Sequence, residues 1–217
     1  MQDPFGHCGV ILAAGESSRM GTDKALLPWP PAAPGADTSS HHTLLSAAIL
    51  ALEPHARAVV VVAGKNVESI ASIVGACAAY MVQNPDPSRG QFSSLQIGLQ
   101  AVLDHHCESA MITPVDCPPL APSSLALLCA SFQGALVRDL WAVAPENKGR
   151  HGHPLLASHE LIRLFLDAPV TGNARDILRA HADRIEYVAV PDDLSRAGMN
   201  TPEEYASYAE DSQPAQD

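Results

Sequence analysis

The chain has 217 residues, of which 47% are hydrophobic and 17% charged, so it can build a buried core and is not disordered throughout. Lysine and arginine number 13 against 24 aspartate and glutamate residues, which gives a net charge of −11. Because such a chain repels a phosphate backbone, nucleic acid is excluded as the expected partner, although a small anion can bind where basic groups are focused in one cleft.

Strand-like apolar runs alternate with helix-like segments along the chain. The expected strands cover residues 9–13, 58–63, 80–83, 109–113, 141–144 and 185–190. The expected helices cover residues 43–52, 67–75, 92–103, 122–131, 158–166 and 174–181, and a last helix begins at Pro202. Strand followed by helix, repeated several times, predicts an α/β fold with a largely parallel sheet.

The organisation predicted beyond these elements is simple. We expect one domain over residues 1–209, a surface loop over the proline- and glycine-rich residues 28–42, and a flexible polar tail over 210–217. The longest aliphatic run, AVVVVA at 58–63, is too short to span a membrane, and the N-terminal residues 1–4 (MQDP) lack the basic region of a secretory signal. The five cysteines form no CxxC pair, which predicts reduced core residues and a cytoplasmic location.

The loop after the first strand has the features of a phosphate-binding site. Ligands bind at the carboxyl ends of parallel strands, and small residues there let the backbone approach an anion closely. Two cations in the same loop, one arginine and one lysine, suit a triphosphate. The residues expected to contact a nucleotide are Leu12, Ala13, Ala14, Gly15, Arg19 and Lys24.

Spacing excludes two other kinds of phosphate loop. A Walker A loop requires GxxxxGK[ST], whereas five residues separate Gly15 from Gly21 and Lys24 follows three positions later. The dinucleotide fingerprint GxGxxG is also absent, which argues against an NAD-dependent oxidoreductase.

The segment L-A-A-G-x-S-x-R-M-G-x-x-K resembles the signature loop of the molybdopterin nucleotidyltransferase family, and within it the molybdenum cofactor cytidylyltransferase branch. The resemblance extends over about residues 8 to 205. It implies a single three-layer α/β/α domain whose mostly parallel, Rossmann-like sheet is of the nucleotide-diphospho-sugar transferase type.

Polar residues follow the third and fourth predicted strands. Ser93 and Ser94 can cap a helix or offer hydroxyls to a base or ribose, and the resemblance implies that Asn84 and these serines lie near the nucleoside. Asp116, in the segment PVDCP, can bind Mg²⁺ or cap the next helix. The resemblance implies that Asp116 binds the metal.

The segment G-R-x-G-H-P at 149–154 contains an H-x-H pair without a third metal ligand nearby, which argues against zinc. The resemblance implies that it forms the wall of the acceptor site, and the residues expected there are Arg150, Gly152, His153 and Pro154. The turn at 171–175 is similar to the family's G-x-G-A-R, with Asn173 in place of glycine. Asparagine tolerates a left-handed backbone, so we expect the turn to be kept.

The segment at 198–202 (GMNTP) leads into the last predicted helix. Thr201 is expected to cap the last helix, which has proline at its first position. Where the family carries acidic residues, this chain has Gly198 and Asn200. The resemblance therefore implies metal binding by Asp116 and the carbonyl oxygen of Asn200.

Taken with the resemblance, these motifs imply Mg²⁺-dependent transfer of CMP from CTP to the phosphate of molybdopterin carrying molybdenum, with release of pyrophosphate. Arg19, Lys24 and Asp116 are the expected catalytic residues, and a molybdoenzyme would receive the product. Ala14, where the guanylyl branch has glycine, favours CTP over GTP. A guanylyltransferase, a cytidylyltransferase of the methylerythritol phosphate type, and a non-catalytic cofactor carrier remain alternatives.

Overall fold

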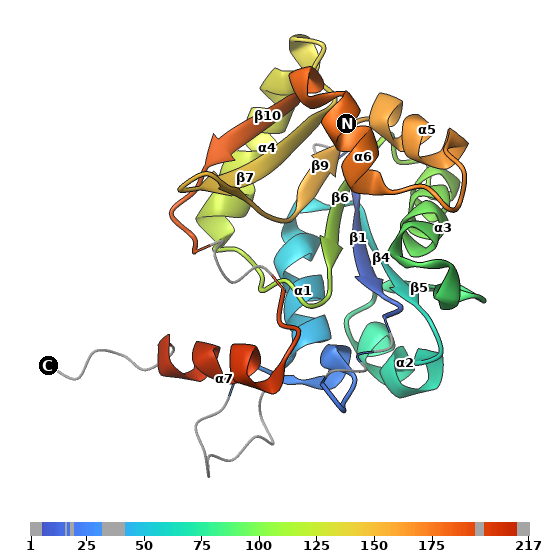
Figure 1. Cartoon of the computed structure of the whole chain (residues 1–217), viewed down its shortest axis with the longest axis vertical. Helices are drawn as coiled ribbons and strands as arrows, with labels where there is room; N and C mark the ends of the chain where they lie inside the picture. Colours follow the sequence, from blue (N-terminus) through green and yellow to red (C-terminus); the bar gives the residue numbers. More distant parts are fainter. Residues whose placement is uncertain (1–5, 16, 18–19, 32–41, 194–197, 212–217) are drawn as a thin grey trace, which may run out of the picture.

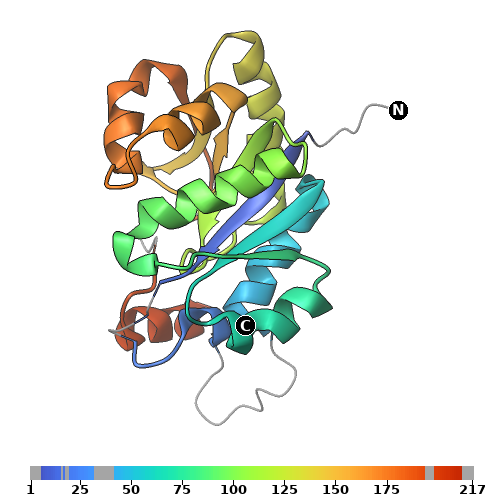
Figure 2. The same cartoon turned by 90° about the vertical axis from the view of Figure 1, so that its right-hand side faces the viewer.

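The computed structural model describes residues 6–15, 17, 20–31, 42–193 and 198–211. These residues form the expected α/β fold, in which one central sheet lies between two layers of helices (Figures 1 and 2).

The central sheet has eight strands in the order β10-β7-β9-β6-β1-β4-β5, with β8 paired to β7. Strand β1 lies inside the sheet and pairs in parallel with β4 and β6. Strand β4 also pairs in parallel with β5, and β7 pairs in parallel with β10. Strand β9 is antiparallel to both of its neighbours, β6 and β7, and was not predicted. The strands are β1 (His7–Ala13), β4 (Ala58–Ala63), β5 (Tyr80–Gln83), β6 (Ser109–Pro114), β7 (Ala142–Asn147), β8 (Arg150–His151), β9 (Leu155–Ala157) and β10 (Ile185–Ala189).

Each face of the sheet has its own apolar core because successive strand residues point to opposite faces. In β1, Ile11 belongs to one core, and Val10 and Leu12 belong to the other. The first core is covered by α1 (Leu44–Leu52), α2 (Val67–Ala76) and α4 (Pro122–Val137). The second is covered by α3 (Gln91–Asp104), α5 (His159–Asp167) and α6 (Ala174–Ala180).

Helix α3 packs unusually close to the sheet at Gly98. A Cβ atom at this position would lie 2.7 Å from Val10 Cγ1 and 2.9 Å from Val62 Cγ2, so the position requires glycine. Helix α3 packs along β1 and β4, and its start lies near the carboxyl end of β1, where the candidate site lies (Figure 2).

The remaining elements are short, apart from α7 (Pro202–Asp211). Thr201 Oγ1 accepts a hydrogen bond from Glu204 N and Glu204 Oε2 accepts one from Thr201 N, so the predicted cap of this helix is confirmed. Helix α7 includes the first two residues of the predicted tail, and residues 212–217 lie outside the described part. The other short elements are β2 (Pro28–Trp29), β3 (His42–Thr43) and the 3₁₀ turns η1 (Lys24–Leu26), η2 (Glu53–His55), η3 (Pro87–Arg89) and η4 (Ala182–Arg184).

Two further predictions concerned the loop at 28–42 and membrane-spanning segments. Strands β2 and β3 pair at the two ends of the predicted 28–42 loop, whose residues 32–41 are not described. Among the described helices, none combines the length and the apolar character needed to cross a lipid bilayer.

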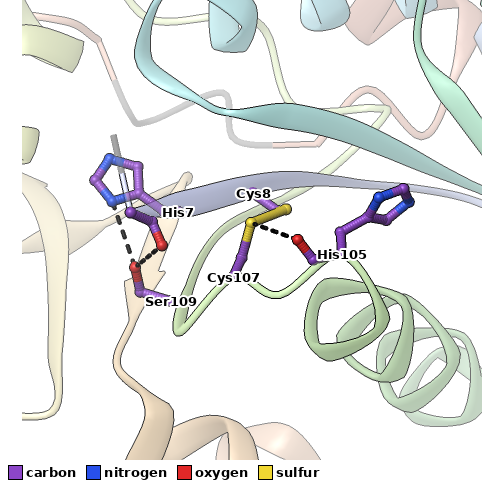
Figure 3. The surroundings of a disulfide bond; sticks show 6 residues. His7, Cys8, His105, Cys107 and Ser109 are labelled. Atoms are coloured by element: carbon purple, nitrogen blue, oxygen red, sulfur yellow. Dashed lines mark hydrogen bonds between the residues drawn. A yellow bond between two sulfur atoms is a disulfide. The ribbon is translucent and has the colours of Figure 1, made fainter. Parts of the chain in front are cut away.

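The prediction that all five cysteines are reduced is wrong for Cys8 and Cys107, which form a disulfide (Figure 3). The two residues are 99 positions apart, and a bridge that closes a loop of this length stabilises the fold by roughly 2–5 kcal/mol. The bridge joins the start of β1 to the residues that lead into β6, at the opposite end of these strands from the candidate site. Because disulfides are rare in the cytosol, the cysteines no longer support a cytoplasmic location.

Candidate active site

A cavity of about 260 Å³ opens at the carboxyl ends of β1 and β6. Of the residues predicted to bind nucleotide, seven line it, and they come from the end of β1, the loop and 3₁₀ turn that follow it, the start of α3 and the loop after β6. These seven are Leu12, Ala13, Ala14, Gly15, Lys24, Ser94 and Asp116. Arg19 lies outside the described residues.

The loop after β1 is held by a network that the sequence analysis missed. Asn66 Nδ2 donates hydrogen bonds to Ala13 O at 3.0 Å and to Asp23 Oδ2 at 2.7 Å. Asn66 Oδ1 accepts from Gly64 N, and Asp23 Oδ1 caps the turn that begins at Lys24 by accepting from Ala25 N. Asn66 therefore joins the loops after β1 and β4 and, through Asp23, fixes the start of the 3₁₀ turn that carries Lys24. The sequence offered one indication of this role, because Asn66 closely follows the predicted strand at 58–63.

Glycine at position 64 is required by the same loop. A Cβ atom there would lie 2.7 Å from Ala14 O and 3.1 Å from Ala14 Cα, so any larger residue would displace the loop backbone. This contact places Ala14 against the strand edge and directs the small residues after it toward the cavity.

Lys24 connects three distant segments of the chain. Its Nζ lies 2.8 Å from Asp116 Oδ2 and 3.0 Å from Asn200 Oδ1. The lysine side chain is 11% exposed and the aspartate side chain 25% exposed. Met199 N also donates a hydrogen bond to Asp116 O, which holds the segment of Asn200 against the loop of Asp116. An ammonium donates three hydrogen bonds, and Lys24 uses two of them among the described residues, so one remains for a ligand in the cavity.

The same two oxygens fit a divalent cation. Asp116 Oδ2 and Asn200 Oδ1 converge on a single positive centre, the lysine ammonium, and both are oxygens of the kind that Mg²⁺ prefers. The set carries one carboxylate only, so phosphate oxygens and water would complete the coordination. Asp116 does not cap the next helix, because α4 begins after Ala121, and the carboxylate is therefore available to the site.

Asn84 and Ser93 lie behind the cavity wall rather than on it. Both are 1% exposed, and Asn84 Nδ2 donates to the hydroxyls of Ser93 and Ser94, each at 2.9 Å. Neither serine caps α3, whose first turn is preceded by Gly90 with a φ of 97°. Asn84 thus fixes the first turn of α3, and Ser94 is the member of this group that reaches the cavity.

A second, larger cavity of about 1010 Å³ adjoins the first. Leu12, Gly90, Gln91 and Pro114 line both. Of the predicted acceptor residues, Gly152 and His153 line this second cavity.

The other two predicted acceptor residues lie elsewhere. Arg150 is exposed and lines neither cavity, because it neighbours His151 in strand β8 and adjacent strand residues point in opposite directions. Pro154 is buried and lines a small third cavity with His153.

Burial keeps two titratable groups near the site uncharged. Burial lowers the pKa of His153, and its Nδ1 lies 3.4 Å from Ile112 O, which can only accept a hydrogen bond. Burial, together with the charge of Asp116, raises the pKa of the Cys117 thiol to about 12. His153 is therefore a neutral acceptor at Nε2, and Cys117 is not a thiolate at neutral pH.

The left-handed backbone expected at Asn173 is wrong. Its φ is −139°, and its Oδ1 instead caps α6 by accepting from Arg175 N at 2.9 Å. The turn keeps its shape through a side-chain cap, which glycine cannot supply.

The fold and the site together define a nucleotide-binding protein of the α/β class, with small residues, a lysine and a carboxylate at the carboxyl edge of its sheet. The model of the MobA-like NTP transferase domain matches residues 9–185. The chain therefore belongs to this family of nucleotidyltransferases.

Two relatives and one solved structure are similar to this chain. The molybdenum cofactor cytidylyltransferase of Escherichia coli (strain K12) is 28% identical over 78% of this chain and 79% of its own. A probable molybdenum cofactor guanylyltransferase of Mycobacterium avium is 27% identical over 97% of this chain and 98% of its own. A nucleotidyl transferase from Methanothermobacter has the same fold, with a TM-score of 0.71 and 17% identity over 94% of this chain and 96% of its own.

Proposed function

We propose that this protein transfers the CMP group of CTP to the phosphate of molybdopterin carrying molybdenum and releases pyrophosphate. The observation that carries the proposal is the pair of adjoining cavities, one lined by the Lys24–Asp116 pair and the other large enough for a second substrate. The relatives named above act on the molybdenum cofactor as cytidylyl- or guanylyltransferases, which supports the choice of acceptor.

In this reaction the acceptor's phosphate oxygen attacks the α-phosphorus of the nucleotide. A new phosphorus–oxygen bond forms as the bond to the leaving pyrophosphate breaks. A phosphate monoester is already anionic near neutral pH, so no general base is needed, and the protein contributes positioning and charge neutralisation. With Mg²⁺ on Asp116 and Asn200, the ammonium of Lys24 would donate to phosphate oxygens, and the backbone from Ala13 to Gly15 would border the triphosphate.

A magnesium ion is part of the proposal, and Asp116 with Asn200 would hold it. When bound, Mg²⁺ neutralises charge that develops on the phosphate oxygens. Asp116 also neutralises Lys24, so it sets the charge of the site in either case.

The choice of base depends on Ala14, which lines the smaller cavity. Its methyl group reduces the room available to a purine, although one methyl group discriminates by only about 1–3 kcal/mol. We therefore propose CTP ahead of GTP, and keep the guanylyl and methylerythritol phosphate reactions as alternatives. A location in the cytoplasm and delivery of the product to a molybdoenzyme belong to the same proposal.

Pyrophosphate release with each of CTP, GTP, UTP and ATP tests the function. With Mg²⁺ and molybdenum cofactor present, we expect CTP to give the fastest release, and we expect none when the cofactor is omitted or Mg²⁺ is chelated. Faster release with GTP would replace the cytidylyl assignment by a guanylyl one. Tight cofactor binding without release from any nucleotide would instead identify a carrier.

A further inference from the structure

Three arginines line the larger cavity of this acidic protein. Its lining includes Arg89, Arg175 and Arg179, and no aspartate or glutamate is among the described residues that line it. The chain as a whole carries a net charge of −11. Arginines in a cavity lining that contains no described acid favour an anionic ligand, even in an acidic chain.

Arg175 differs from the other two arginines in its surroundings. Arg89 lies 3.7 Å from a carboxylate oxygen of Asp86, and Arg179 lies 3.1 Å from one of Asp176. Within the described part of the chain, the Arg175 side chain makes no ion pair and no hydrogen bond. Its guanidinium is exposed and keeps its full donor set for a ligand.

The turn that carries Arg175 lies beside the junction of the two cavities. A Cβ atom at Gly172 would lie 3.3 Å from Phe92 Cε1, so the turn packs directly on the first turn of α3. Gln91, the residue before Phe92, lines both cavities. Asn173 fixes the direction in which the chain continues into α6 by capping the backbone N–H of Arg175.

The rest of the cavity suits the body of a larger molecule. Phe92, Leu95 and Phe165 supply apolar wall, and His151 stacks on Tyr187 with ring centroids 3.6 Å apart and an angle of 11° between the rings. Both rings line the cavity, and aromatic surface of this kind suits a planar ring system.

We propose that Arg175 binds the phosphate of the acceptor, a phosphate monoester attached to a larger and partly planar body. The inference rests on the proposed function and adds a binding residue to it. A guanidinium matches phosphate oxygens with two parallel hydrogen bonds, and its charge reduces the repulsion between the acceptor phosphate and the triphosphate. Arg175 thus takes the role that the sequence analysis gave to Arg150.

The test compares Arg175→Ala with Arg163→Ala, which removes the same charge from an exposed position on α5 that does not line the cavity. Initial rates of pyrophosphate release are measured while the molybdenum cofactor and CTP are varied in turn. For Arg175→Ala we expect KM for the cofactor to rise roughly 10- to 100-fold and KM for CTP to stay within about twofold. Arg175→Lys should recover part of the loss, and Arg163→Ala should match the wild type.

A binding measurement separates this inference from the proposed function. Each variant is incubated with the cofactor and passed through a gel-filtration column, and the molybdenum that elutes with the protein is quantified. If the wild type retains molybdenum without releasing pyrophosphate, the transferase function fails, while loss of retention in Arg175→Ala still supports the inference. If Arg175→Ala matches Arg163→Ala in both retention and KM for the cofactor, the inference is overturned.

Discussion

Replacement of Lys24 by alanine is expected to lower the rate of pyrophosphate release roughly 10²-fold or more, the scale seen when one preorganised charge is removed from a reaction site. Among the described residues that line the smaller cavity, the substitution removes the one cation, which contacts Asp116 and Asn200. Turnover at saturating CTP and cofactor is the quantity to measure.

Two further variants separate this effect from misfolding. Lys148→Ala removes a lysine from the exposed turn after β7, outside both cavities, and should leave turnover unchanged. Lys24→Met keeps an unbranched side chain without the charge and should lose activity as Lys24→Ala does. Near-normal pyrophosphate release by either Lys24 variant would exclude a catalytic role for the lysine.

Asp116→Ala and Asp116→Asn are both expected to lower turnover by roughly 10²- to 10³-fold and to remove its dependence on Mg²⁺. The carboxylate is the one acid in the described lining of the smaller cavity besides Asp23, which is engaged by Asn66 and by the cap of η1. The rate is measured as a function of Mg²⁺ concentration.

The structural share of the Asp116 effect can be measured separately. Removal of this carboxylate leaves the charge of Lys24, which is mostly buried, without its acidic partner, so the single variants should also be less stable. Combining Asp116→Asn with Lys24→Met removes both charges and should restore much of the free energy of unfolding without restoring activity. Asp104→Asn, on the exposed side of α3, is the matched control. An active Asp116 variant with an unchanged response to Mg²⁺ would refute the assignment.

The strands and helices were largely predictable because their patterns are local. The predicted runs at 58–63 and 80–83 coincide with β4 and β5, and the other main elements differ mainly at their ends. Strand β9 was missed because its three residues are too few to show a period. The Cys8–Cys107 bridge was missed because a separation of 99 residues closes only once β1 and β6 lie side by side.

The candidate site shows the same division between local and distant information. Lys24, Asp116 and Asn200 were each found from a motif, but the contact between them joins positions 92 and 176 residues apart and needed the fold. The motif around residue 150 drew attention to Arg150, whereas the alternation of strand β8 sends His151, not Arg150, to the cavity. Arg175 lines the same cavity from α6, and no local sequence pattern could link it to the segment around residue 150.

The central claim is that one cavity, bordered by Gly15, Lys24 and Asp116, holds a nucleoside triphosphate. A crystal structure of the protein with Mg²⁺ and a non-hydrolysable CTP analogue tests it most directly. We predict the triphosphate along the loop after β1, within hydrogen-bonding distance of Lys24 Nζ, with its metal on Asp116. A nucleotide bound elsewhere, or a cavity without nucleotide at a saturating concentration, would contradict the account.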